Sequence, residues 1–99
     1  MTVTDRATGK VYRDIWEAIE PNPVIALNLR MRSDLMRVID RRVKDWKLTQ
    51  KDSAKRLGIT QPRLNLLLKG DINAFSLDAL IKIAATAGIE VNLEFKNAA

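Results

Sequence analysis

Residues 50–70 read QKDSAKRLGITQPRLNLLLKG and are the most informative part of the sequence. Its pattern predicts two short helices joined by a tight turn. Thr49 is a favourable N-cap because its side-chain oxygen can accept a hydrogen bond from a backbone N–H at the helix start. Asp52, three residues later, occupies the position of a capping-box acid. Gly58 is expected to end the first helix, since glycine readily adopts the positive φ found at many helix C-termini.

The second helix of this stretch is predicted to begin after Thr60 and to end at Gly70. Pro62 is tolerated in the first turn, where its missing N–H costs nothing. Three leucines recur at helical spacing and form the stripe to be buried: Leu64, Leu67 and Leu68. The small side chain of Ala54 allows the two helices to approach closely. These features indicate a helix-turn-helix, which inserts its second helix into the major groove of DNA. A capped helical hairpin without a DNA role is the alternative.

The net charge of +5 is unevenly distributed along the chain. Residues 41–70 contain nine Lys and Arg residues against two Asp residues, a net charge of +7, so the remaining residues carry −2. The basic excess therefore coincides with the predicted helix-turn-helix and the helix before it, where DNA phosphates would lie. A solvated basic face is the alternative interpretation, but its coincidence with the motif favours nucleic acid.

Composition excludes several classes of function. The 99 residues make one domain with one small core. The chain has no cysteine and no histidine, so we expect no disulfide, no metal site and no cofactor. Without these residues and without a phosphate-binding glycine loop, an enzyme is rejected. The sequence shows neither a membrane-spanning run nor a signal peptide, which predicts a cytoplasmic protein with no membrane partner.

The N-terminal part predicts a short amphipathic helix over residues 11–20, ended by the prolines that follow. Residues 1–29 are expected to form an N-terminal arm that carries this helix, and residues 30–99 the helix-turn-helix domain. The apolar stripe of the helix packs on its own domain or binds a partner. Its candidate partner-binding residues are Tyr12, Ile15, Trp16 and Ile19.

Two further helices complete the predicted bundle of four to five helices, which makes the fold class all-α. The segment after Pro23 has helical period, with an apolar stripe at Leu35, Val38, Ile39, Val43 and Trp46. Ser76 caps another helix, whose inward residues are predicted to be Leu77, Leu80, Ile81 and Ala84.

The C-terminal tail changes to a period of two, which predicts a short β-strand with one apolar face. A lone strand needs a partner, and the same strand of a second copy would supply one across a two-fold axis. The predicted dimerisation residues are Ile83, Ala87, Val91, Leu93 and Phe95. An extended tail packed on the bundle is the alternative.

The motif as a whole resembles the lambda-repressor-like helix-turn-helix family, often called the Xre type. The matching residues are Gln50, Ala54, Gly58, Gln61, Leu64, Leu67 and Gly70. Within that family the run FSLDALIKIAATAGIEVNLEF and the upstream DIWEAIEPNPVIALNLRMRSDLM are similar to small HigA-like antitoxins. That resemblance implies autoregulation of a toxin–antitoxin operon and a RelE-like ribonuclease as partner.

By the resemblance, the second helix reads bases through its N-terminal residues. The implied base-reading residues are Gln61, Pro62, Arg63, Asn65 and Leu66. Gln61 suits a bidentate contact to adenine, Arg63 suits guanine, and Pro62 or Leu66 suits a thymine methyl group. The residues expected to hold phosphates are Lys47, Thr49, Gln50, Lys51, Thr60 and Lys69.

The sequence therefore predicts a dimeric, sequence-specific repressor that binds a near-palindromic operator in double-stranded DNA, with antitoxin as its setting. The alternative is a protein-interaction module that mainly neutralises a RelE-like toxin through its N-terminal segment.

Overall fold

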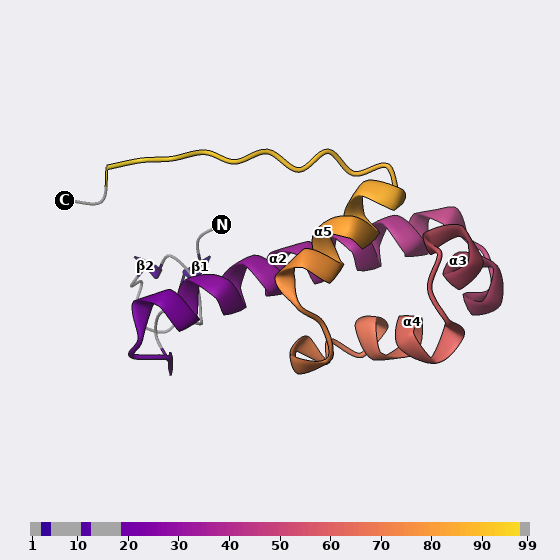
Figure 1. Ribbon diagram of the computed structural model, residues 1–99, viewed down its shortest axis with the longest axis horizontal. Coiled ribbons are helices and arrows are strands. Elements are labelled where there is room, and N and C mark those ends of the chain that lie inside the picture. Colours follow the sequence, from indigo (N-terminus) through magenta and orange to yellow (C-terminus); the bar gives the residue numbers. More distant parts are fainter. Residues whose placement is uncertain (1–2, 5–10, 13–18, 98–99) are drawn as a thin grey trace.

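The computed structural model describes residues 3–4, 11–12 and 19–97 (Figure 1). Its longest element is helix α2 (Pro23–Trp46). Two helices of eight residues follow, α3 (Gln50–Leu57) and α4 (Gln61–Leu68), and then a 3₁₀ turn, η1 (Ile72–Ala74). Helix α5 (Leu77–Thr86) packs along α2. Residues 19–97 thus form a small helical bundle, as the sequence predicts. None of the helices in the described part of the chain is long and apolar enough to span a membrane.

Helix α2 is the central helix of the bundle, and α4, η1 and α5 contact it. Asn22 caps it, since the side-chain oxygen accepts hydrogen bonds from the backbone N–H groups of Val24 and Ile25. The helix runs without interruption through residues 29 and 30, where the sequence suggested a boundary between arm and domain. It ends at Lys47, which adopts the left-handed conformation with φ of 55°.

The core forms where α2, α3, α4 and α5 meet, and η1 packs against it. Its largest fully buried side chains include Phe75 and Ile39. Two arginines of α2 hold η1 and the end of α5 against this helix through hydrogen bonds. Arg32 donates hydrogen bonds from Nη1 to the carbonyls of Ile72 (2.9 Å) and Phe75 (3.3 Å), and Arg42 donates to the carbonyl of Ala87 (3.2 Å) at the end of α5.

The predicted inward face of α5 is partly wrong. Ile83 and Ala87, expected at a dimer surface, are only 4% and 5% exposed and belong to the core. Ile81, expected inside, is 39% exposed. The buried residues follow the helical pattern i, i+3, i+4 and i+7 from Leu80, and packing against α2 selects this face. Val38 of α2 was likewise predicted to be buried, but its side chain is exposed.

The predicted C-terminal β-strand is also wrong for this chain. Residues 89–97 are extended and have no regular secondary structure. A strand needs a hydrogen-bonded neighbour, and the described residues offer none to this segment. The strand pair of the structure is formed instead by β1 (Val3–Thr4) and β2 (Val11–Tyr12), which run antiparallel.

The helix predicted over residues 11–20 is therefore wrong at its start, because Val11 and Tyr12 lie in β2. Ile15 and Trp16 of the predicted partner-binding set lie outside the described residues. Ile19 is described and exposed.

We predict that Arg32→Ala destabilises the fold by about 1–3 kcal/mol, because it leaves two half-buried carbonyls without their donor. Urea denaturation followed by circular dichroism measures the change. Arg41→Ala is the matched control on the same helix; as an exposed residue, it should change stability by no more than about 0.5 kcal/mol. Equal effects of both substitutions would contradict the anchoring role of Arg32.

Candidate nucleic-acid interface

The turn between α3 and α4 has the predicted caps. Thr49 Oγ1 accepts a hydrogen bond from the backbone N–H of Asp52 (3.1 Å), and Thr60 Oγ1 accepts one from the N–H of Arg63 (3.2 Å). Gly58 ends α3 with φ of 71°, and its N–H bonds the carbonyls of Ala54 and Lys55. Since each threonine hydroxyl uses only its acceptor side here, its proton remains available for a phosphate oxygen.

Packing fixes α3 and α4 in place. Ser53, Ala54 and Leu57 are the buried residues of α3, and Leu64 and Leu67 are those of α4. The end of α3 is also held to α2 by the guanidinium of Arg56, which lies 4.2 Å from the ring centroid of Trp46. The two helices of the motif are therefore held by the core rather than by the short turn alone.

Most of the predicted base-reading residues share the open face of α4. Gln61, Pro62 and Leu66 are exposed, and Asn65 is half-buried. This face is open because Leu64 and Leu67 turn the opposite side of the helix into the core. The structure thus brings together an amide pair for hydrogen bonding and two apolar groups for methyl contacts, on one surface.

Arg63 is not part of that open face in the structure. Its guanidinium lies 4.4 Å from the ring centroid of Phe75, a buried residue of the loop before α5. Beside it is a cavity of about 250 Å³ between the α3–α4 turn and α5, where Lys82 and Thr86 also contribute to the lining. To reach a guanine, Arg63 would have to leave the ring, so its base contact stays a prediction.

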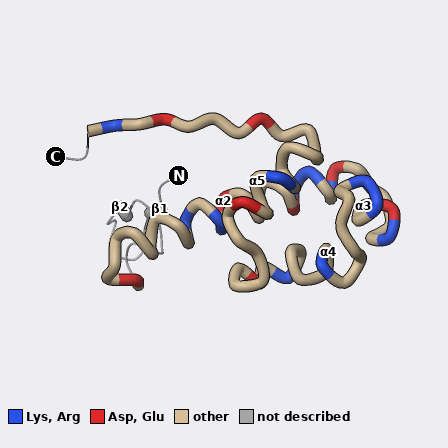
Figure 2. The backbone as a smooth tube through the Cα atoms, viewed as in Figure 1, with Lys and Arg blue, Asp and Glu red and all other residues tan. Residues whose placement is uncertain are grey.

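The predicted phosphate-binding residues lie at two ends of the motif. Lys47, Thr49, Gln50 and Lys51 are exposed around the start of α3, and Thr60 is exposed at the start of α4. Lys69 follows the last turn of α4. Figure 2 shows that Lys and Arg gather on and around α3. Thr60 and Lys69 therefore lie at opposite ends of α4.

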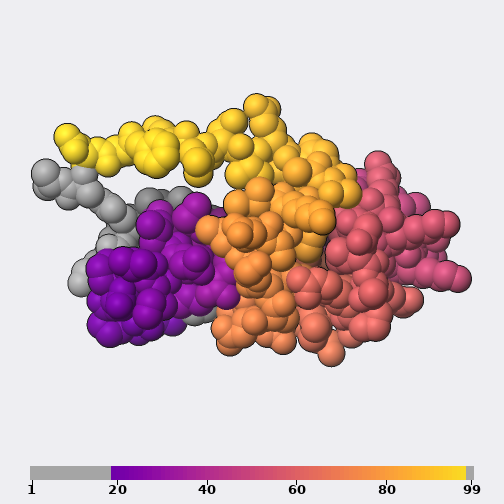
Figure 3. Space-filling model, in the orientation of Figure 1, coloured from indigo at the N-terminus to yellow at the C-terminus, as the bar shows by residue number. Residues whose placement is uncertain are grey.

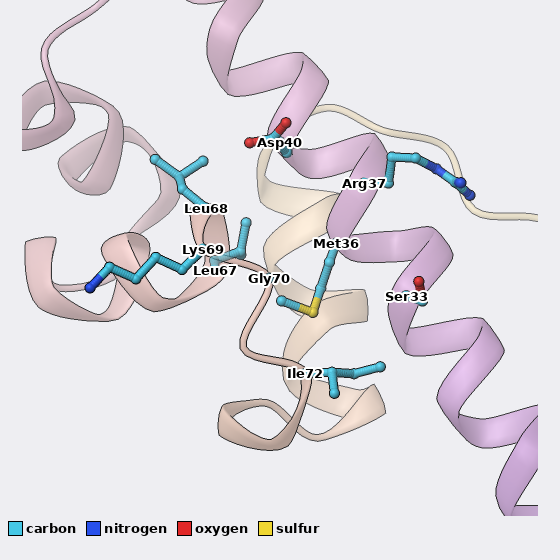
Figure 4. A pocket seen from close by; sticks show the side chains of 9 residues that line it. All are labelled: Ser33, Met36, Arg37, Asp40, Leu67, Leu68, Lys69, Gly70 and Ile72. Carbon is cyan, nitrogen blue, oxygen red and sulfur yellow. The ribbon is translucent and has the colours of Figure 1, made fainter. Parts of the chain in front are cut away.

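A cleft behind α4 has no counterpart in the sequence analysis. It measures about 290 Å³ and lies between α2 and the end of α4 (Figure 4). Met36 points into it, whereas the ends of Arg37 and Lys69 point away. Asp40 at its edge forms an ion pair with Lys44 (2.9 Å). No sequence signal marks it, since its walls come from α2 on one side and from the end of α4 and η1 on the other, about 30 residues later in the chain.

The Arg63–Phe75 contact was also missed by sequence reasoning. An arginine beside a helix stripe and an aromatic residue in a loop give no sign of contact until the packing brings them together. The same holds for Arg56 and Trp46.

Comparison with known proteins agrees with this geometry. Residues 23–96, from the start of α2 into the tail, match a family model described as "Helix-turn-helix domain". No curated protein matches the chain. Because the family match covers well over half of the sequence and includes both helices of the motif, the chain belongs to the helix-turn-helix domain family.

Proposed function

We propose that this protein is a sequence-specific DNA-binding repressor that binds a near-palindromic operator as a dimer. The observation that carries the proposal is the open face of α4. That face places Gln61 and Asn65 beside the apolar Pro62 and Leu66, on a helix held by the core and framed by basic residues. A helix with amide and apolar groups along its exposed face suits readout of base edges in a major groove.

The proposed base contacts divide by chemistry. Gln61 makes a bidentate contact to adenine, and Asn65 adds a second amide on the same face. Pro62 and Leu66 have no donor to offer and contact thymine methyl groups. Arg63 reaches guanine after leaving Phe75, at the cost of that cation–π contact.

The proposed phosphate contacts set the register of the motif on DNA. The backbone N–H groups at the start of α3, together with Thr49 and Gln50, hold one phosphate. Thr60 does the same at the start of α4. Lys47, Lys51 and Lys69 add attraction that does not depend on sequence.

We place the protein in the lambda-repressor-like, Xre-type branch of helix-turn-helix proteins, near the HigA-like antitoxins. The support is the likeness of the sequence in and around the motif, together with the caps at Thr49, Gly58 and Thr60. The setting would be an operon that the protein represses, with a RelE-like toxin as the neighbouring product. The cytoplasmic location stays a prediction.

Toxin neutralisation is the second candidate function, and one observation favours it. The first turns of α2 lie outside the main core and expose apolar side chains at Val24 (75%), Ile25 and Leu27. Ile19 just before them is exposed as well. Such a patch suits a partner protein better than DNA.

We predict that binding to a fragment of the protein's own promoter falls steeply with salt. About six phosphate contacts would give a log–log slope near −5, and a loss of affinity of about three orders of magnitude between 50 and 200 mM salt. Fluorescence anisotropy at several salt concentrations measures the slope. If the protein does not bind the fragment, or if its affinity does not change with salt, the proposed repressor function is ruled out.

We predict that reading and anchoring residues separate by substitution. Gln61→Ala should cost roughly 1–3 kcal/mol on the operator and relax the preference at one base pair. Lys51→Ala should weaken binding to all sequences alike and reduce the salt slope by about 1. Selection of sites from a random duplex library measures both. An unchanged base preference for Gln61→Ala would show that another face reads the DNA.

If the protein neutralises a toxin, the double substitution Val24→Ser and Leu27→Ser should affect toxin neutralisation but not DNA binding. These exposed substitutions should weaken neutralisation of a RelE-like toxin encoded beside this gene about tenfold, because they remove apolar contact area. Operator affinity should not change. Rescue of growth on co-expression with the toxin measures neutralisation, and fluorescence anisotropy measures operator affinity. Full rescue by the double variant would exclude this surface as the toxin-binding site.

A further inference from the structure

Arg63 lies on the border between the buried side and the open side of α4. It stands three residues before the exposed Leu66 and four before the buried Leu67, so it shares one flank of the helix with both. Its backbone is fixed, because its N–H donates a hydrogen bond to Oγ1 of Thr60 (3.2 Å) in the cap of the helix. Only the side chain can therefore turn from the core toward the open face.

The side chain of Arg63 is turned toward Phe75. Its guanidinium carbon lies 4.4 Å from the centroid of that ring, within the roughly 6 Å of a cation–π contact. Figure 3 shows α4 directly against the segment from η1 to α5, from which the ring comes. Since no described residue forms a hydrogen bond or an ion pair with the guanidinium, the ring contact is what holds it.

Phe75 cannot follow the arginine toward DNA. Its side chain is only 2% exposed. Its carbonyl accepts a hydrogen bond from Arg32 of α2 (3.3 Å), and Ser76, directly after it, caps α5. The ring is thus fixed between two helices, and Arg63 must leave it in order to contact a base.

The cavity beside this contact offers Arg63 room but no competing partner. Among the described residues that line its volume of about 250 Å³, Lys82 is the other charged side chain, and it has the same sign. Like charges repel, so Lys82 does not attract the guanidinium away from the ring. The strength of the cation–π contact therefore decides how readily Arg63 becomes available to DNA.

We propose that Phe75 is a specificity-determining residue, which withholds Arg63 from DNA unless a guanine lies at the position that this arginine can reach. The proposal rests on the DNA-binding function of the preceding subsection and adds a residue outside the two helices of the motif. Guanine presents two acceptors, O6 and N7, to which a released guanidinium donates in parallel. At other base pairs Arg63 has no such partner and stays on the ring.

The contact with Phe75 lowers the preference for guanine, because only binding to guanine requires its loss. A cation–π contact of this kind corresponds to a factor of about 2 to 30 in an equilibrium constant. A bidentate contact to guanine discriminates against the wrong base by about 5- to 150-fold. Phe75 thus divides the guanine preference by the first factor without touching DNA.

Selection of sites from a random duplex library, followed by fluorescence anisotropy, tests the role of Phe75. Phe75→Leu keeps an apolar side chain in the core but removes the ring. The ratio of affinities for duplexes with guanine or adenine at the position read by Arg63 should rise about fivefold. This ratio does not depend on the fraction of protein that is folded.

Trp46→Leu is the matched control. It removes the other cation–π contact, in which the guanidinium of Arg56 lies 4.2 Å from the ring centroid of Trp46. Arg56 belongs to α3 and not to the open face of α4, so the ratio should not change. An equal change in both variants would overturn the proposal.

The same substitution in an Arg63→Met background isolates the pair. Arg63→Met keeps an unbranched side chain but has no guanidinium. Alone it should remove the guanine preference at that position, and adding Phe75→Leu should then leave the ratio unchanged. A fivefold rise that persists without the guanidinium would show that Phe75 acts through packing, and would overturn the proposal.

NMR spectroscopy of the wild-type protein tests the contact without altering the core. Protons above the face of an aromatic ring resonate upfield, and comparison with Arg63→Met identifies the signals of the arginine. These signals should be shifted upfield in the free protein and on the adenine duplex, and should lose the shift on the guanine duplex. Unshifted signals in the free protein, or signals that stay upfield on the guanine duplex, overturn the proposal.

The outcomes separate the role of Phe75 from the proposed function. A wild-type protein that selects no duplex overturns the repressor, and the reading role of Arg63 with it. A wild-type protein that selects a site, but whose guanine preference is the same with Phe75→Leu, overturns the role of Phe75 alone.

Discussion

Burial of Leu64 and Leu67 in the core orients helix α4 and, through it, the surface proposed to bind DNA. Helix α4 has only eight residues, so fixing these two side chains in the core determines which of the others face outward. An exposed α4 of this length would not be stable alone, because short helices depend on tertiary packing. The surface proposed to read DNA is thus set by the core.

The core is in turn organised by α2. Its 24 residues supply Met36, Ile39 and Val43 to the apolar cluster, and its arginines bond carbonyls of η1 and the end of α5. These hydrogen bonds satisfy backbone groups that helices cannot satisfy at their ends. One long helix therefore aligns the motif and holds the loop that follows it.

Local chemistry made the motif predictable from sequence. Thr49, Gly58, Thr60 and Ser76 act within three or four residues of their own position, so their capping roles can be read directly from the chain. The buried side of residues 61–68 could also be predicted, because the leucines lie in a narrow stripe that leaves one choice of inward face. The Arg63–Phe75 contact was not, since it depends on where a separate loop packs.

Helix α5 shows where periodicity stops being informative. Its sequence LDALIKIAAT is apolar on nearly all sides, so the spacing alone admits either Ile81 or Ile83 as the buried residue. Contact with α2 decides in favour of Ile83. The tail has the converse difficulty: its alternation correctly indicates an extended chain, but a strand exists only with a partner, which the sequence of one chain does not show.

Lys47 links the backbone geometry to the proposed function. It is the only residue besides glycine with positive φ in the described part of the chain, and a left-handed conformation costs a side-chain-bearing residue roughly 1–2 kcal/mol. Glycine would serve this C-cap without strain. A lysine is accounted for by its position, since it is exposed between α2 and α3, beside Thr49 and Lys51. In the proposed complex with DNA, this positive charge would lie beside the phosphate at the start of α3, and that contact would offset the strain.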